Sequence, residues 1–289
     1  WKQVDLLLAQ FNPSLRCFTT KKYEEEKVDA MLSRAFELRG EKPLTLALDC
    51  TIDFINSKKV SHILKTFQKE IQEGRLNVIC YRSGLKFDLF GMDNYCGAPF
   101  YMIHSEHCHW SSFDLLLKEE ALVTDLLSFN WFCLAYKHTG LDLDLYRKAI
   151  FDHTRKLMSQ IPYSLFEKSS PFRVIRSDEK SDLSFIDIKI SGALHPLRGA
   201  VIAGGLLYLK CMENRVPIFH RTGFGFYHAN FSMLFFPKFT TIRLTLGLDS
   251  SEIETFVNIF QAFDLLNEKP MRLSKLVKKD NTLKKREIK

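Results

Sequence analysis

The stretch Leu44-Thr45-Leu46-Ala47-Leu48, which leads into Asp49-Cys50-Thr51, decides the fold class. A short, continuous apolar run of this kind is typical of a parallel strand that is buried on both faces. Two more runs, Val4–Ala9 and Leu76–Tyr81, have the same character. We therefore expect three buried strands in the first part of the chain.

Amphipathic segments separate these three runs. Lys21–Leu38 and Ser57–Gln72 carry apolar residues at helical spacing, and the segments are followed by Gly40 and Gly74, which are typical helix C-cap residues. The order strand, helix, strand, helix, strand with short loops predicts an α/β fold.

The rest of the chain predicts a helical middle and a second domain. Apolar segments predict helices at Phe113–Leu127, Phe129–Tyr136 and Leu143–Ile161, the last of them long enough to connect two domains. From Phe172 onward, strand-like alternation is interleaved with helical stretches, which predicts an α+β domain. The predicted strands are Phe172–Arg176, Phe185–Ile190, Gly225–Phe236 and Thr240–Gly247, and the predicted helices are Leu197–Glu213 and Ser250–Leu266.

The positive charge of the protein lies at its C-terminal end. The net charge is +7, and the segment 269–289 contains nine Lys or Arg residues against two acidic ones, which accounts for all of it. The remaining residues are neutral overall, which argues against a basic nucleic-acid-binding surface on the folded body. No apolar run approaches the roughly 18 residues of a membrane span. We expect neither a specific nucleic-acid partner nor a membrane span.

Seven cysteines are scattered singly, without a CxxC pair. An odd number of isolated cysteines is typical of a reducing, intracellular compartment, so we expect a cytoplasmic protein.

Polar residues follow each of the three predicted parallel strands, where open α/β sheets bind their ligands. They are Asn12-Pro13 after the first strand, Asp49-Cys50-Thr51 after the second and Ser83-Gly84-Leu85-Lys86 after the third. An amide, a carboxylate, a hydroxyl and an amine at one edge suit a pyridine cofactor bound as a lysine imine. Lys86 would supply the amine, Asp49 would keep the ring nitrogen protonated, Asn12 would donate to the ring hydroxyl and Ser83 would reach the phosphate.

At these residues the chain resembles the fold-type I pyridoxal-phosphate enzymes, the superfamily of aminotransferases and of lyases and synthases of cysteine and methionine metabolism. In that family an Asn-Pro turn, an Asp-x-Thr strand end and a Ser-x-x-Lys turn follow one another in this order. Ile242–Asp249 resembles the family's strand that carries a carboxylate-binding arginine, here Arg243, and Gly223–Phe226 is similar to the segment just upstream. An Arg fork meets a carboxylate bidentately.

The resemblance spans residues 1–266 and implies both a fold and an incomplete chain. It implies a three-layer αβα domain with a mainly parallel sheet, a partial large domain of the aspartate-aminotransferase type, followed by a smaller C-terminal α+β domain. The implied boundaries are 1–140 for the large domain, 141–165 for a connecting helix, 166–268 for the small domain and 269–289 for a flexible basic tail.

The resemblance also implies an activity on an amino acid, by transamination or by elimination or replacement at Cβ or Cγ. Pyridoxal 5'-phosphate would be bound by Asn12, Asp49, Thr51, Ser83 and Lys86, and Lys86 would form the imine and move the α-proton. Arg243 would hold the substrate carboxylate. A homodimer is expected, with no metal ion.

Two features depart from the family pattern. The family's phosphate-binding Gly/Ser turn and its ring-stacking aromatic lie well upstream of the Asn-Pro turn, and no counterpart stands in this sequence. Asp93-Asn94 stands where many members carry an arginine that holds the phosphate. An acidic residue there would repel a phosphate.

Other interpretations remain open. Asn12 could be a turn former, Asp49 a turn carboxylate and Arg243 part of an ion pair on a strand face. The protein could also be a non-catalytic remnant of the fold that acts as a binding protein. The run His104–Trp110 could bind zinc, although no second ligand pair is evident, and any of the cysteines could be a nucleophile beside a histidine. The basic tail could attract nucleic acid or acidic membrane in a salt-dependent way.

Overall fold

The computed structural model describes most of the chain, which divides into two compact units. The described residues are 4–11, 28–52, 57–84, 86–91, 97–106, 108, 126–175, 184–190, 196–221 and 226–268. The first unit comprises Trp1–Lys148, Lys180–Asp182 and Gly223–Tyr227, and the second comprises Ala149–Glu179, Leu183–Thr222 and His228–Lys289. Each unit has its own sheet and its own hydrophobic core.

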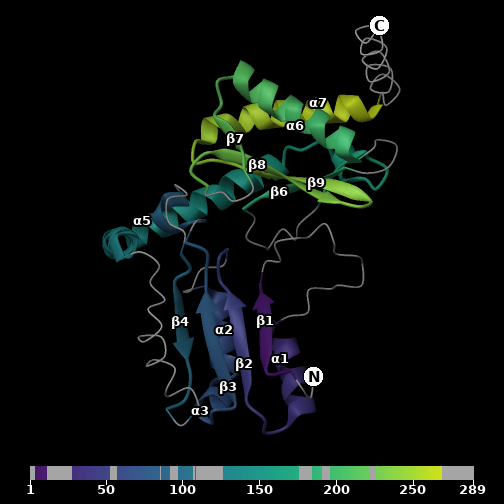
Figure 1. The fold of residues 1–289 in the computed structure, drawn as a ribbon. Coiled ribbons are helices and arrows are strands. Elements are labelled where there is room, and N and C mark those ends of the chain that lie inside the picture. The colour runs from purple at the N-terminus through teal and green to yellow at the C-terminus, as the bar shows by residue number, and fades with distance from the viewer. Residues whose placement is uncertain are drawn as a thin grey trace, which may run out of the picture. The chain divides into compact units, whose positions relative to one another are not determined.

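A four-stranded mixed sheet forms the centre of the first unit (Figure 1). Its strand order is β1-β2-β3-β4, in which the first three strands are parallel and the last is antiparallel to its neighbour. The strands are β1 (Leu6–Gln10), β2 (Leu44–Asp49), β3 (Leu76–Tyr81) and β4 (Phe100–Ile103). The three parallel strands confirm the sequence prediction, whereas β4 was missed.

Three helices pack on one face of this sheet (Figure 1). They are α1 (Val28–Arg39), α2 (Lys58–Thr66) and α3 (Gln68–Gln72). Alternate residues of β2 and β3, among them Leu46 and Val78, are fully buried against Leu32 and Ile63 of these helices. The predicted C-cap glycines Gly40 and Gly74 both have positive φ, as a helix C-cap requires. Helices packed on a mainly parallel sheet give this unit its α/β character.

The predicted helix Ser57–Gln72 is interrupted. Ser57 caps α2 through its side chain, which accepts a hydrogen bond from the Val60 backbone N–H at 3.2 Å. The backbone leaves the helical conformation at Phe67, with φ −107° and ψ 23°. Phe67 is buried, and its ring packs on Phe36 with centroids 6.0 Å apart. The Phe67 N–H still donates to the Ile63 carbonyl and the Ile71 N–H to the Phe67 carbonyl, both at 3.0 Å, so the two helices follow each other without a loop.

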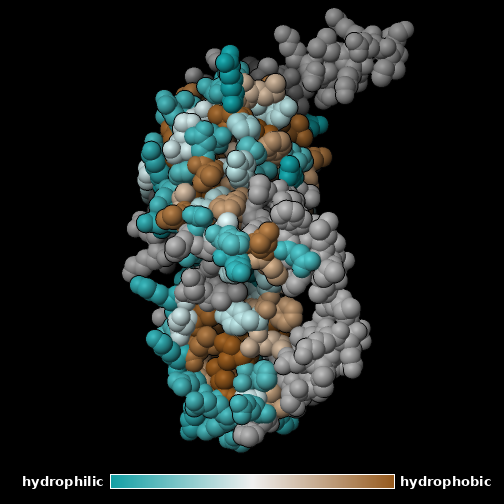
Figure 2. Space-filling model, turned by 90° about the vertical axis from the view of Figure 1, so that its left-hand side faces the viewer, coloured by the Kyte–Doolittle hydropathy of each residue, from teal (hydrophilic) through white to brown (hydrophobic). Residues whose placement is uncertain are grey.

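The other face of the sheet carries exposed hydrophobic residues. Leu6 and Leu8 of β1 are 52% and 65% exposed, and Phe100 of β4 is 43% exposed. Figure 2 shows a patch of hydrophobic residues over the first unit, seen from the β4 side. Parallel sheets are usually covered on both faces. None of α1, α2 and α3 covers this face, so the three-layer αβα arrangement stays a prediction.

A single helix, α5 (Leu126–Met158), occupies most of the middle of the chain. The sequence predicted separate helices at Phe129–Tyr136 and Leu143–Ile161, whereas the structure continues one helix through the segment between them. None of the helices in the described part of the chain combines the length and the hydrophobicity that a membrane span requires.

The second unit contains a five-stranded mixed sheet in the order β5-β6-β9-β8-β7. Neighbouring strands are antiparallel except for β7 and β8, which are parallel. The strands are β5 (Phe172–Val174), β6 (Ile186–Ile190), β7 (Ile218–His220), β8 (Ala229–Phe236) and β9 (Phe239–Thr245). The sequence located four of these strands and missed the three-residue strand β7.

Two helices cover one face of this second sheet (Figure 1). They are α6 (Pro196–Glu213) and α7 (Ile253–Glu268), and the short 3-10 helices η3 (Tyr163–Phe166) and η4 (Ser250–Glu252) precede β5 and α7. Leu207 of α6 and Phe260 of α7 are fully buried in the same core as Ile188 and Ile242 of the sheet. The pattern of alternating strands and amphipathic helices predicted this arrangement of elements.

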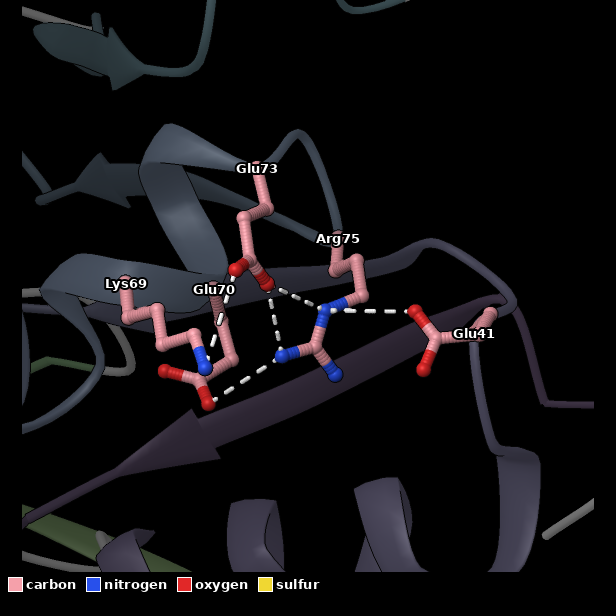
Figure 3. Close-up of polar contacts among 5 residues, drawn as sticks. All are labelled: Glu41, Lys69, Glu70, Glu73 and Arg75. Atoms are coloured by element: carbon pink, nitrogen blue, oxygen red, sulfur yellow. Dashed lines mark hydrogen bonds and ion pairs between the residues drawn. The ribbon is translucent and has the colours of Figure 1, made fainter.

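A charged network ties the helices to the amino-terminal edge of the first sheet (Figure 3). Arg75, which precedes β3, lies 2.9 Å from Glu73, 3.4 Å from Glu70 and 3.7 Å from Glu41, and Lys69 lies 3.8 Å from Glu73. Networks of this kind contribute more to stability than isolated surface pairs. Because α/β sheets bind ligands at the opposite, carboxyl edge, we assign this network to stability.

Candidate functional site

The carboxyl ends of β2 and β3 lie side by side and carry three of the predicted site residues. Asp49 is opposite Tyr81 in the parallel register. The backbone N–H of Thr51 donates to Asp49 Oδ1 at 2.9 Å, and the backbone N–H of Ser83 donates to Thr51 Oγ1, also at 2.9 Å. This run of hydrogen bonds brings Asp49, Thr51 and Ser83 together at one edge of the sheet.

Two polar groups of this run have no hydrogen-bond partner among the described residues. Asp49 is half-buried, and its second oxygen, Oδ2, has no hydrogen-bond partner among the described residues. The same holds for the Ser83 hydroxyl. The edge therefore offers one carboxylate oxygen and one hydroxyl to a ligand.

Lys86 lies in a turn that begins at Ser83. Its backbone N–H is 3.5 Å from the Ser83 carbonyl oxygen, and the Gly84 N–H donates to the Gly97 carbonyl at 2.8 Å. Lys86 itself is half-buried. The next residue, Phe87, is 2% exposed and stacks on Phe226 with centroids 4.5 Å apart. The buried ring fixes the end of the turn, so the lysine is presented from an anchored backbone at the same edge as Asp49.

A buried ion pair joins the residues on either side of this turn. Arg82 Nε lies 3.0 Å from Asp88 Oδ2, and Arg82 Nη2 lies 2.8 Å from Asp88 Oδ1. Their side chains are 3% and 1% exposed, and the guanidinium also lies over the Tyr136 ring at 5.0 Å. Burial raises the pKa of Asp88, and the Arg82 charge opposes part of that rise.

Sequence reasoning missed this pair. Asp88 opens the 3-10 helix η2 (Asp88–Gly91), so the two partners flank the Ser83–Lys86 turn. An Arg and an Asp six positions apart around a Ser-x-x-Lys turn is the signal that was present in the sequence.

Tyr81 is a second residue that sequence reasoning missed. Burial raises the pKa of its phenol above the usual value, and the neighbouring Asp49 carboxylate raises it further. The phenol is therefore neutral over the physiological range and stands beside the carboxylate that was predicted to bind a ring nitrogen.

Two buried thiols lie behind the edge, on the helix-covered face of the sheet. Cys50 and Cys80 are both fully buried in the core of the first unit. A hydrogen bond with the Cys50 thiol lowers the pKa of Cys80, an effect that burial opposes. Among the described residues no group of three or more His, Cys, Asp or Glu side chains could hold a metal ion. Cys108 Sγ lies 3.2 Å from His104 Nδ1.

Arg243 belongs to the second unit and is engaged in an ion pair. In the β6–β9 register it lies opposite Asp187, and its Nε and Nη2 donate to the two carboxylate oxygens at 2.9 Å and 3.0 Å. Its guanidinium also stacks on Phe185 at 4.0 Å. The bidentate face of its fork is thus occupied by Asp187, and its role toward a substrate carboxylate stays a prediction.

Several predicted features lie outside the described residues. They are Asn12-Pro13, Leu85, Asp93-Asn94, His107, His109-Trp110, Gly223–Gly225 and the basic segment 269–289. The predicted roles of Asn12 and of the basic tail therefore stay predictions.

Comparison with known proteins returned little similarity. No protein-family model matches the chain, and no curated protein matches it. Among solved structures it is similar to 4-hydroxyphenylacetaldehyde synthase from Rhodiola rosea, with 10% sequence identity and a TM-score of 0.46. The match covers 89% of this chain and 49% of that enzyme, so the chain spans about half of the enzyme's length.

Proposed function

We propose that this chain binds pyridoxal 5'-phosphate at the carboxyl edge of its first sheet and that Lys86 is the attachment point. The observation that carries the proposal is the hydrogen-bonded run from Asp49 through Thr51 to Ser83, next to the anchored turn that presents Lys86. The donor set fits the cofactor, since it contains the Lys86 amine and the Thr51 hydroxyl. It also contains Asp49 Oδ2 and the Ser83 hydroxyl, which have no hydrogen-bond partner among the described residues.

The proposal gives each side chain a defined role. Asp49 accepts a hydrogen bond from the protonated ring nitrogen through Oδ2, because Oδ1 is held by the Thr51 backbone. Ser83 and Thr51 donate their hydroxyl protons to the phosphate. Lys86 supplies the amine for covalent attachment and afterwards takes or returns the substrate α-proton.

The cofactor, when bound, supplies an electron-poor ring that delocalises the negative charge left at a substrate carbon. The substrate class is then an α-amino acid, and the reaction is transamination or elimination or replacement at Cβ or Cγ. In this proposal Arg243 holds the substrate carboxylate, Asn12 contacts the ring hydroxyl, and the protein acts as a homodimer.

A second candidate function is a binding protein that keeps the fold without catalysis. The observation in its favour is that Asp187 occupies the fork of Arg243. This candidate keeps the fold, has lost the cofactor and does not turn over amino acids.

Visible absorbance on addition of pyridoxal phosphate tests the proposal. The wild-type chain should develop a band that Lys86→Ala abolishes and that a substitution of the exposed Lys65 leaves unchanged. Asp49→Ala should weaken binding by about ten- to a hundredfold, the effect of losing a hydrogen bond to a charged group. An equal band in Lys86→Ala and in wild type would contradict the proposal. Amino-acid turnover by a chain that shows the band separates the enzyme from the binding protein.

A further inference from the structure

α6 carries a row of exposed hydrophobic side chains beside its buried face. Leu197, Val201, Tyr208 and Met212 are 51%, 62%, 49% and 59% exposed. They follow one another at intervals of four, seven and four residues, so they share one side of the helix with Gly205 between them. These five residues form what we call the α6 stripe. Contiguous exposed apolar surface, unlike scattered single residues, marks an interaction site.

Gly205, at the middle of the stripe, has no packing role among the described residues. A Cβ added at the neighbouring Gly204 would lie 2.2 Å from Met233 Cε and 3.3 Å from Phe231 Cε2, so close packing on the sheet explains that glycine. A Cβ added at Gly205 would meet nothing within 4 Å. Glycine lowers helix stability relative to alanine. A glycine that is costly and has no packing reason inside the described chain points to close approach of a second body.

The intervals between the hydrophobic residues of the α6 stripe, four, seven and four, are the same when the helix is followed from either end. An antiparallel copy of α6, related by a two-fold axis near Gly205, places Leu197 opposite Met212 of the second copy and Val201 opposite its Tyr208. The two-fold axis then passes between positions 204 and 205, so the Gly205 residues of both copies lie close to the crossing point. Two-fold interfaces require such self-complementary surfaces. We propose that the α6 stripe binds the α6 stripe of a second copy of this chain.

Charges at the two ends of the stripe agree with this arrangement. Arg198 and Glu213 are both exposed. Glu213 lies 2.7 Å from Lys210 of its own helix, and Arg198 has no ion-pair partner among the described residues. The antiparallel pairing brings Arg198 of one copy beside Glu213 of the other. A parallel pairing would instead place like charges together. The antiparallel orientation therefore gives Arg198 an acidic neighbour, which Glu213 shares with Lys210 of its own helix.

The size of the stripe sets the expected strength. At 1.5 Å rise per residue, the segment from Leu197 to Met212 is about 23 Å long. A contact between two such segments is at the low end of specific interfaces, below about 1,200 Å² in total. We therefore expect a reversible dimer that forms at micromolar to millimolar concentration, independently of any cofactor.

Sedimentation of the full chain over about 10 μM to 1 mM tests this interface. The wild-type chain should show a concentration-dependent dimer. Gly205→Ala should weaken association about tenfold while raising the melting temperature of the chain by about 2–4 °C, because alanine favours the helix. A loss of association together with a gain in stability cannot be produced by misfolding. Val201→Glu should abolish the dimer over this range, since it buries unpaired carboxylates.

Leu145→Glu is the matched control, because Leu145 is an exposed leucine on another helix, at 66% exposure. It should leave the dimer unchanged. A chain that stays monomeric at 1 mM, or a dimer that Gly205→Ala and Val201→Glu do not weaken, would overturn the proposal. So would a chain that dimerises only after removal of residues 269–289, because that segment would then be the occupant of the α6 stripe.

Discussion

Replacement of Glu252 by glutamine should remove a pH dependence from the stability of the second unit. Glu252 ends η4 at the start of α7 and is 7% exposed. Its Oε2 is buried without a hydrogen-bond partner among the described residues. Burial, and to a lesser extent the Asp249 carboxylate, raises its pKa from 4.5 to about 7. Cys211 of α6, with a pKa raised to about 12, faces the carboxyl group and stays protonated.

The sign of the effect follows from proton binding. Between pH 4.5 and about 7 the folded state keeps a proton on Glu252, whereas the unfolded chain releases it. The stability contribution is therefore complete below pH 4.5 and is lost as the pH rises through about 7. A difference of about 2.5 pKa units at 1.36 kcal/mol each gives a loss of about 3 kcal/mol. Glutamine is neutral throughout and avoids this loss.

Urea unfolding at pH 5, 6, 7 and 8, with hydrogen exchange of α6 and α7 amides as the local readout, measures the effect. Glu252→Gln should exceed the wild type in stability by up to about 3 kcal/mol at pH 8 and match it near pH 5. Glu254→Gln is the matched control, because Glu254 is an exposed residue two positions along the chain, in the first turn of α7, and it should behave as wild type. Parallel pH profiles for wild type and Glu252→Gln would refute the reasoning.

Three further substitutions test the packing around the site and in the second unit. Asp88→Ala leaves Arg82 buried without its carboxylate and should destabilise the first unit by about 3–5 kcal/mol in urea unfolding, whereas a change under about 1 kcal/mol would show that the pair is not buried in solution. Thr51→Val removes the acceptor for the Ser83 N–H, so it should lower stability by about 1–2 kcal/mol and weaken pyridoxal phosphate binding about tenfold. Thr51→Ser should restore both the stability and the affinity. A valine variant with native affinity would show that the hydrogen-bonded run is not part of the ligand site. Gly247→Ala places a Cβ 2.9 Å from two backbone atoms and should lower stability by about 1–3 kcal/mol; an unchanged melting temperature would contradict that close approach.

Much of the fold was accessible from hydrophobic patterning. β2 and β3 read as continuous apolar runs because both of their faces are largely covered, and their parallel pairing follows from the helices between them. Short elements without such a pattern were not accessible. β4 and β7 have four and three residues, and their pairing depends on neighbouring strands. α5 was divided in the prediction because the segment 137–142, between its two apolar parts, is mostly polar.

The residues of the candidate site were located by the rule that ligands bind at the carboxyl ends of parallel strands. That rule predicted that Asp49, Thr51, Ser83 and Lys86 lie at one edge of the sheet. Hydrogen bonds link the first three residues there, and the Lys86 backbone lies in the turn that begins at Ser83. Their roles toward a ligand stay predictions. Side-chain pairing could not be read in the same way. Which carboxylate meets Arg82 or Arg243 depends on strand register and turn geometry, and both of these arise only in the folded chain.

The central claim is that Lys86 is the covalent attachment point of pyridoxal phosphate. The most direct test is to add the cofactor, reduce with borohydride and locate the modified lysine by peptide mass spectrometry. We expect modification of Lys86 at a low excess of pyridoxal phosphate, whereas exposed lysines such as Lys65 should react only at a high excess. Modification spread over exposed lysines, with Lys86 unmodified, would contradict it.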